Sequence, residues 1–283
     1  MLQALARWIR RVTGNPTPIP DVLWHATLSR YPFLARLPQP ERERLRCLAM
    51  HFLHRKQFTG AHGLTVTDAM AVAVAAQACL PLLHLGPPGQ PQQALRWYDD
   101  FVGIVMHPDS AIARRQVMDS AGVVHDYDEV LSGEAMQRGP VMLSWPAVQQ
   151  AGAHGEAGYS VVIHEFVHKM DMQDGGADGV PPLPRGFMGA RNARQAATHW
   201  QRTWAPAYQR FHEQVARAER FGASRPWLDP YAASAPAEFF AVACEAHLTQ
   251  PERFAEEFPE LSAALRAFFR QDTGPAKAYQ VDR

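Results

Sequence analysis

The chain has 283 residues, of which 47% are hydrophobic and 20% charged, so it has enough apolar material for a large core and the composition of an ordinary globular protein. Lys and Arg together number 28, as do Asp and Glu, and this zero net charge gives no sign of a nucleic-acid-binding surface. The three cysteines are widely spaced, which excludes a disulfide framework and a C-x-x-C thiolate site and favours free thiols in a reducing cytoplasm.

The first fourteen residues mix apolar side chains with three arginines. They lack the uninterrupted apolar run of a signal peptide, and no run in the chain reaches the roughly eighteen residues of a membrane helix. We expect this segment to pack on the domain or to fray, rather than to lie on a membrane as a basic amphipathic helix. The sequence therefore predicts a cytoplasmic protein without a membrane partner.

Residues 15–95 are predicted to be mostly helical. Prolines punctuate residues 16–40 and favour extended chain with short helices, one of them over Val22–Leu28. Apolar residues at helical spacing predict a helix over residues 41–55, and Thr67 or Asp68 is expected to cap an alanine-rich helix that ends at Ala78.

The pattern changes after the Gly- and Pro-rich stretch 86–93. Short apolar runs separated by turn residues predict strands at 101–106, within 117–124, at 129–137 and at 141–145. Strands so closely connected favour a small antiparallel or mixed sheet. Residues 141–145 are the candidate edge strand, to which an extended segment could add as a further strand, although they are equally consistent with an inner strand.

The strongest chemical signal is H-E-x-x-H, formed by His164, Glu165 and His168. On a helix, residues i and i+4 lie on one face, so both imidazoles can bind one metal ion, while Glu165 can reach a water molecule at that metal. The surrounding residues are apolar and predict a buried helix over about 157–173, where polar side chains need a partner. Lys169 is charged where an uncharged residue is usual, and we expect it to point away from the metal.

Asp171 lies three residues after His168, on the same helical face. It is a candidate acceptor for an imidazole N–H, but it could also be solvated near the helix end or cap the following loop. A long amphipathic helix is predicted from Asn192 to Phe221, kinked or divided at Pro206, and two short helices are predicted between residues 251 and 271.

A zinc site needs a third protein ligand, and the best candidates downstream are two glutamates of one predicted helix, Glu238 and Glu245. Ser234 is expected to cap a helix that has Pro236 in its first turn, which places Glu238 near the start of an otherwise apolar helix. Glu245 lies seven residues later on nearly the same face, so it is either the rival ligand or a carboxylate that supports a ligand.

Two stretches resemble the Mlc titration factor A family of zinc metallopeptidases. They are V-I-H-E-F-V-H-K-M-D-M at 162–172 and D-P-Y-A-A-S-A-P-A-E-F-F-A-V at 229–242. C-L-P-L-L-H-L-G at 79–86 and G-P-V-M-L-S-W at 139–145 extend the resemblance over most of residues 40–270. The two main motifs are also similar to the catalytic domain of anthrax lethal factor, a gluzincin peptidase.

The resemblance implies that one Zn²⁺ is held by His164, His168 and Glu238, with Glu165 as catalytic base and the phenol of Tyr231 pointing into the site. It implies a zinc peptidase acting on peptides or proteins, and it leaves open whether this is an aminopeptidase and whether a protein partner regulates it. The alternative function is a binding protein of little activity that sequesters a transcriptional repressor. No direct nucleic-acid contact is expected.

The expected fold is α+β and zincin-like. We divide the chain into an N-terminal extension (1–40), one catalytic domain (41–272) and a tail (273–283). Within the domain, residues 41–95 are predicted to be helical, 96–150 to form the sheet, 157–173 the active-site helix and 190–272 a helical C-terminal part.

Overall fold

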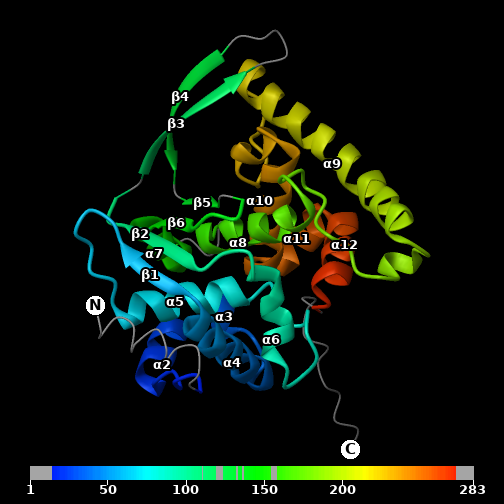
Figure 1. Ribbon diagram of the computed structural model, residues 1–283. Coiled ribbons are helices and arrows are strands. Elements are labelled where there is room, and N and C mark those ends of the chain that lie inside the picture. The colour runs from blue at the N-terminus through cyan, green and yellow to red at the C-terminus, as the bar shows by residue number, and fades with distance from the viewer. Residues whose placement is uncertain are drawn as a thin grey trace, which may run out of the picture.

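The computed structural model describes residues 15–109, 111–118, 124–131, 133–135, 137–153 and 158–271. Helices predominate, as expected, and a small sheet lies among them (Figure 1). The α-helices are α2 (Asp21–Arg30), α3 (Pro32–Ala35), α4 (Gln39–Arg55), α5 (Asp68–Cys79), α6 (Pro91–Ala94), α7 (Trp145–Ala153), α8 (Val161–Asp171), α9 (Ala193–Phe221), α10 (Pro236–Thr249), α11 (Pro251–Glu257) and α12 (Pro259–Phe269). The 3₁₀ helices are η1 (Leu95–Tyr98), η3 (Met172–Asp174), η4 (Phe187–Gly189) and η5 (Pro230–Ala233). The strands are β1 (Gln57–Gly60), β2 (Gly103–His107), β3 (Ala111–Met118), β4 (Val124–Leu131), β5 (Gly133–Ala135) and β6 (Val141–Ser144).

The main sheet has the strand order β1-β2-β6-β5, and its three strands β1, β2 and β6 are parallel. Of the two predicted alternatives, an antiparallel sheet is wrong: the sheet is mixed, and only the short strand β5 runs antiparallel, beside β6. The physical reason is the crossover between β1 and β2, which carries α5 and α6 and returns the chain to the same end of the sheet. Since β6 lies between β2 and β5, it is an inner strand and not the candidate edge.

Strands β3 and β4 pair with each other in a separate antiparallel ribbon. The ribbon projects away from the main sheet toward the end of α9 (Figure 1). Its first strand ends at Met118 and its second begins at Val124, and most of the strand predicted within 117–124 lies outside the described residues. Part of the region predicted to be sheet is instead the helix α7, which follows β6 directly.

Several predicted helices are confirmed. Residues 21–30 and 39–55 form α2 and α4, and α5 begins after Thr67, whose hydroxyl accepts a hydrogen bond from the N–H of Met70 at 3.3 Å. The long helix α9 is undivided although Pro206 lies inside it. Its N-cap residue is Asn192, whose side-chain oxygen accepts a hydrogen bond from the N–H of Gln195. The two C-terminal helices are α11 and α12.

The helix with the H-E-x-x-H motif, α8, lies at the centre of the molecule. It packs between α5 on one side and α10 on the other, with β5, β6 and α7 also against it (Figure 1). Ten of its eleven residues are buried, and the exception is His164. Two elements from the predicted N-terminal extension, α2 and α3, contribute Trp24 and Leu34 to the same hydrophobic core. The division of the chain at residue 40 stays a prediction.

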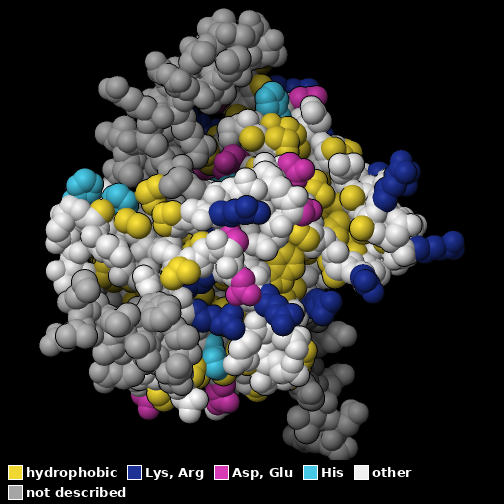
Figure 2. Space-filling model, in the orientation of Figure 1, with side chains coloured by type: hydrophobic (Ala, Val, Ile, Leu, Met, Phe, Trp, Pro, Cys, Tyr) yellow, Lys and Arg dark blue, Asp and Glu magenta, His cyan; other side chains and the backbone are white. Residues whose placement is uncertain are grey.

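Basic and acidic side chains are interspersed on the described part of the face in Figure 2, in line with the net charge of zero. In the part of the chain that the structure describes, none of the helices combines the length and apolarity needed to cross a bilayer.

Candidate metal centre

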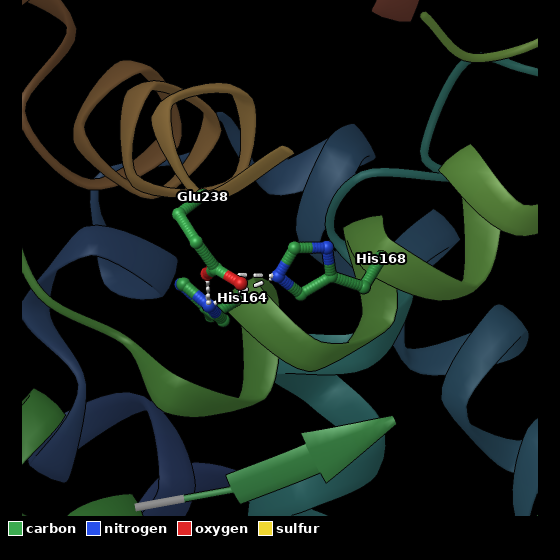
Figure 3. A group of neighbouring side chains, drawn as sticks. All are labelled: His164, His168 and Glu238. Carbon is green, nitrogen blue, oxygen red and sulfur yellow. Dashed lines mark hydrogen bonds and ion pairs between the residues drawn. The ribbon is translucent and has the colours of Figure 1, made fainter. Parts of the chain in front are cut away.

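The two histidines of the motif are held on one face of α8. This helix starts where Ser160 caps it, because the Ser160 hydroxyl accepts a hydrogen bond from the N–H of Ile163 at 3.2 Å. The start is four residues later than the sequence predicted, and the helix ends at Asp171, where the chain tightens into η3. From this helix His164 and His168 project toward the start of α10 (Figure 3).

Glu238 lies in the first turn of α10 and points back at both imidazoles (Figure 3). Pro236 is the first residue of this helix, as expected, but the capping position belongs to Ala235 and not to Ser234. The Ser234 hydroxyl instead donates to the carbonyl of Tyr231 at 2.7 Å, so it closes the preceding helix η5. Ser234 is the C-cap residue of η5, so only Ala235 lies between it and the first residue of α10.

Three atoms converge in this centre: the Nε2 atoms of His164 and His168 and Oε2 of Glu238. The carboxylate oxygen lies 3.0 Å from the His164 nitrogen and 3.2 Å from the His168 nitrogen, and the two nitrogens are 3.1 Å apart. Tetrahedral zinc with bonds of about 2.0–2.2 Å sets its ligand atoms roughly 3.3–3.6 Å apart. The three atoms are therefore spaced for a metal after shifts of a few tenths of an ångström.

The protonation chemistry of the three atoms also fits a cation. Nδ1 of His164 lies 2.7 Å from the carboxylate of Glu245, which can only accept, so Nδ1 carries the proton of the neutral ring and Nε2 keeps its lone pair. A second imidazole nitrogen and a carboxylate oxygen face that lone pair. Such a group of electron-rich atoms needs a positive charge among them, and among the described residues it is the one group of three or more His, Cys, Asp or Glu side chains arranged to bind a metal.

The pKa shifts of His164 and Glu238 also indicate a site for a cation. Burial lowers the pKa of His164, but the carboxylates of Glu245 and Glu238 outweigh burial and raise this pKa well above its usual range. Burial also opposes ionisation of Glu238, yet its close contacts with both imidazoles hold its pKa well below its usual range. A field that attracts a proton this strongly also attracts a metal cation.

Glu165 is buried beside the two histidines, and it is not one of the three converging groups. Burial raises the pKa of this carboxyl, while the imidazoles of His164 and His168 act in the opposite direction. A carboxylate whose pKa is raised toward neutrality is a better proton acceptor at physiological pH than an exposed one.

Tyr231 lies on η5, at the edge of the centre. Its ring centroid is 6.2 Å from that of His164, and the two rings are tilted by 40°. Asp229 caps η5 by accepting a hydrogen bond from the Tyr231 N–H at 2.9 Å, and this fixes the backbone from which the ring projects. The phenol is half-buried, so it stands between the core and the solvent side of the site.

The two carboxylates whose roles the sequence left open behave differently. Glu245 is not a member of the converging group; it accepts hydrogen bonds from His164 and from the backbone of Ser160. Asp171 is buried and accepts from the Gly179 N–H at 2.8 Å, so it caps the loop that follows η3. Its other oxygen and Nδ1 of His168 are both buried and have no hydrogen-bond partner within the described part of the chain, so no hydrogen bond joins these two residues there.

Lys169 is fully buried and forms an ion pair with Asp100 at 2.5 Å. Its ammonium also lies 4.8 Å from the ring centroid of Phe101. The charge that breaks the usual motif pattern is therefore neutralised on the far side of α8 from the imidazoles.

Two contributors to the centre were missed from the sequence. Ser160 and Gln77 are joined by a hydrogen bond of 2.9 Å, from the serine hydroxyl to the amide oxygen, and both are fully buried. Each residue has a feature in the sequence that could have identified it. Ser160 directly precedes the apolar start of the motif helix, and Gln77 is the one polar side chain among the buried residues of α5.

Comparison with known proteins agrees with this geometry. The family described as "Glucose-regulated metallo-peptidase M90" matches residues 5–270. The chain is 33% identical over 250 residues to proteins named Mlc titration factor A from Yersinia pestis (strain Pestoides F) and from Yersinia pseudotuberculosis serotype O:1b (strain IP 31758). In both comparisons the alignment covers 88% of this chain and 84% of the relative.

Proposed function

Because this chain belongs to the glucose-regulated metallopeptidase M90 family, we propose that it is a zinc-dependent peptidase with a zincin-like fold, whose metal is held by His164, His168 and Glu238. The observation that carries the proposal is the convergence of two imidazole nitrogens and one carboxylate oxygen within 3.2 Å of one another. This donor set suits zinc, and three protein ligands leave one coordination position for chemistry. When bound, zinc supplies a Lewis acid that polarises the scissile carbonyl and makes water acidic near neutral pH.

The chain's own residues supply the proton transfers. Glu165 takes a proton from the attacking water and passes it to the nitrogen of the leaving amine, for which its raised pKa suits it. The Tyr231 hydroxyl, beside His164, donates a hydrogen bond to the oxyanion that forms on the substrate carbonyl. We place the reaction in the cytoplasm, with peptides or proteins as substrates, and propose aminopeptidase action as one alternative beside internal cleavage.

The decisive experiment compares the zinc-loaded protein with Glu165→Gln on a mixed set of fluorogenic peptides. We expect the wild type to cleave some of them and the variant to lose turnover while retaining one zinc per chain. Glu213→Gln, on the exposed side of α9, is the control and should keep full activity. Near-normal turnover by Glu165→Gln would refute the assignment of the base.

A second function is supported by the name of the relatives, which states titration of Mlc. We propose a transcriptional repressor as a protein partner of this chain, in addition to peptidase action. The extreme alternative is a binding protein with little activity. Zinc-loaded wild type that cleaves no peptide, but retains a repressor from cell extract on an affinity column, would favour that alternative. Absence of any retained protein would weaken the partner proposal.

A further inference from the structure

A chain of hydrogen bonds runs from α5 to the metal centre through buried side chains. Gln77 accepts from the Ser160 hydroxyl at 2.9 Å, and the Ser160 N–H donates to Oε2 of Glu245 at 2.6 Å. The other carboxylate oxygen of Glu245, Oε1, accepts from Nδ1 of His164 at 2.7 Å. The chain thus links three helices that lie far apart in sequence.

The three side chains that lead to His164 are shielded from solvent. Gln77 and Ser160 have no exposed surface, and Glu245 is 2% exposed. A buried carboxylate without polar partners would be strongly destabilising, yet here each oxygen of Glu245 has its own donor. The remaining polar atoms are also satisfied, since the Gln77 amide donates to the Ala73 carbonyl and the Ser160 hydroxyl accepts from Ile163.

Resting on the proposed function, we infer that Glu245 is a positioning residue, which holds His164 as the Nδ1–H tautomer with its Nε2 lone pair aimed at the metal, and that Ser160 and Gln77 hold Glu245 in place. The two carboxylate oxygens of Glu245 have different partners. Oε1 orients the imidazole, and Oε2 ties the same carboxylate to the residue just before α8, so the carboxylate is itself held in position and rotation of the ring breaks its hydrogen bond to Oε1.

His168 provides an internal contrast. Its Nδ1 is buried without a hydrogen bond among the described residues, so no side chain fixes its tautomer in the same way. The centre therefore has one imidazole that is oriented before a metal arrives and one that is not. Orientation of His164 in advance reduces the free energy needed to assemble the site.

The test is Glu245→Gln, which keeps the size of the side chain but not its two acceptors. An amide has one acceptor oxygen, so either the Ser160 N–H or the His164 Nδ1–H must face an NH₂ group. We expect zinc affinity, measured by competition with a chromogenic chelator, to fall by about 10- to 100-fold. The matched control is Thr249→Val, which removes a buried hydroxyl one turn later on α10 without touching His164.

Two further measurements separate positioning from general destabilisation. Long-range ¹H–¹⁵N correlation spectra report the tautomer of each imidazole in the metal-free proteins, at a pH high enough for His164 to be neutral. The fraction of His164 in the Nδ1–H form should be the same in the wild type and in Thr249→Val and smaller in Glu245→Gln. Thermal unfolding of the metal-free proteins gives the stability of each variant. Gln77→Met, at the far end of the chain, should fold and show a smaller loss of zinc affinity than Glu245→Gln, so the inference remains testable even if Glu245→Gln does not fold.

The outcomes are distinct. Unchanged zinc affinity and an intact Nδ1–H signal in Glu245→Gln would overturn the inference, as would an equal loss of affinity in Thr249→Val. A wild type that binds no zinc would instead overturn the proposed function. The imidazole spectra of the metal-free wild type and Glu245→Gln would then still decide whether Glu245 sets the tautomer of His164.

Discussion

The α-carbon of Gly179 lies directly against the backbone carbonyl of Pro236. A Cβ atom on Gly179 would be 2.7 Å from that oxygen, and the glycine has a φ of +81°, which other residues rarely adopt. Its N–H donates to Asp171 at the end of α8, and its carbonyl accepts from the indole N–H of Trp200 at 2.7 Å. This glycine therefore sets the separation between the end of the histidine helix and the start of the glutamate helix.

Gly179→Ala should weaken the metal centre, because the methyl group pushes Pro236, and with it Glu238, away from the imidazoles. Gly186→Ala is the matched control, since Gly186 has a φ of +75° but nothing within 4 Å of its Cβ position. Both variants incur the backbone strain of about 1–2 kcal/mol, and only Gly179→Ala adds the steric cost of roughly 1–3 kcal/mol. Chemical unfolding and zinc competition measure the two effects, and equal zinc affinities in the two variants would contradict this account.

Tyr231→Phe should lower kcat by roughly 10- to 1,000-fold while leaving zinc bound, because it removes one donor to the oxyanion. Tyr208→Phe is the control: the Tyr208 hydroxyl donates to the Ala233 carbonyl at 3.0 Å and so supports η5 from α9 without facing the centre. Peptide hydrolysis and zinc content measure both variants. A similar loss of kcat in Tyr208→Phe would mean that the phenol of Tyr231 acts through the position of η5 rather than on the substrate.

Acid should destabilise the fold through His247, which is fully buried on α10 beside Phe254 and Phe269. Burial, with a contribution from Arg266, lowers the pKa of this imidazole from 6.5 to about 3. The folded protein therefore resists protonation while the unfolded chain accepts a proton, so stability is full above about pH 6.5 and is lost progressively as the pH falls toward 3. At pH 4 the loss from this group is about 3 kcal/mol.

His247→Leu removes this titration. Urea unfolding in the presence of a metal chelator should show a smaller fall in the free energy of unfolding between pH 8 and pH 4 for the variant than for the wild type. Parallel pH profiles for the two proteins would show that His247 does not contribute to acid sensitivity.

Local patterns were sufficient to predict most helices and the two histidines that converge. The i and i+4 spacing of His164 and His168 needs only helical geometry, and the amphipathic pattern of α9 extends over its 29 residues. Glu238 was ranked ahead of Glu245 partly through family resemblance, because spacing alone puts both on one face of α10.

What could not be predicted depends on contacts between distant segments. The parallel sheet requires β1, which directly follows the long helix α4 in the sequence. This strand has four residues with half-exposed side chains, too few to show a recognisable alternation of apolar and polar residues. The role of Glu245 depends on how α10 crosses α8, since its partner His164 is 81 residues away. Asp171 presented three plausible roles because the loop that it caps is fixed by packing on Pro236 and not by local sequence.

The buried ion pair of Lys169 with Asp100 has a consequence for how relatives of this protein are found. A search pattern that demands an uncharged residue after the second histidine would pass over this chain, although the charge is neutralised by a carboxylate from 69 residues earlier in the sequence. A lysine in that position and an aspartate just ahead of β2 should therefore change together among homologues. Chains that carry the lysine without the aspartate would need another anion at the same place in the core.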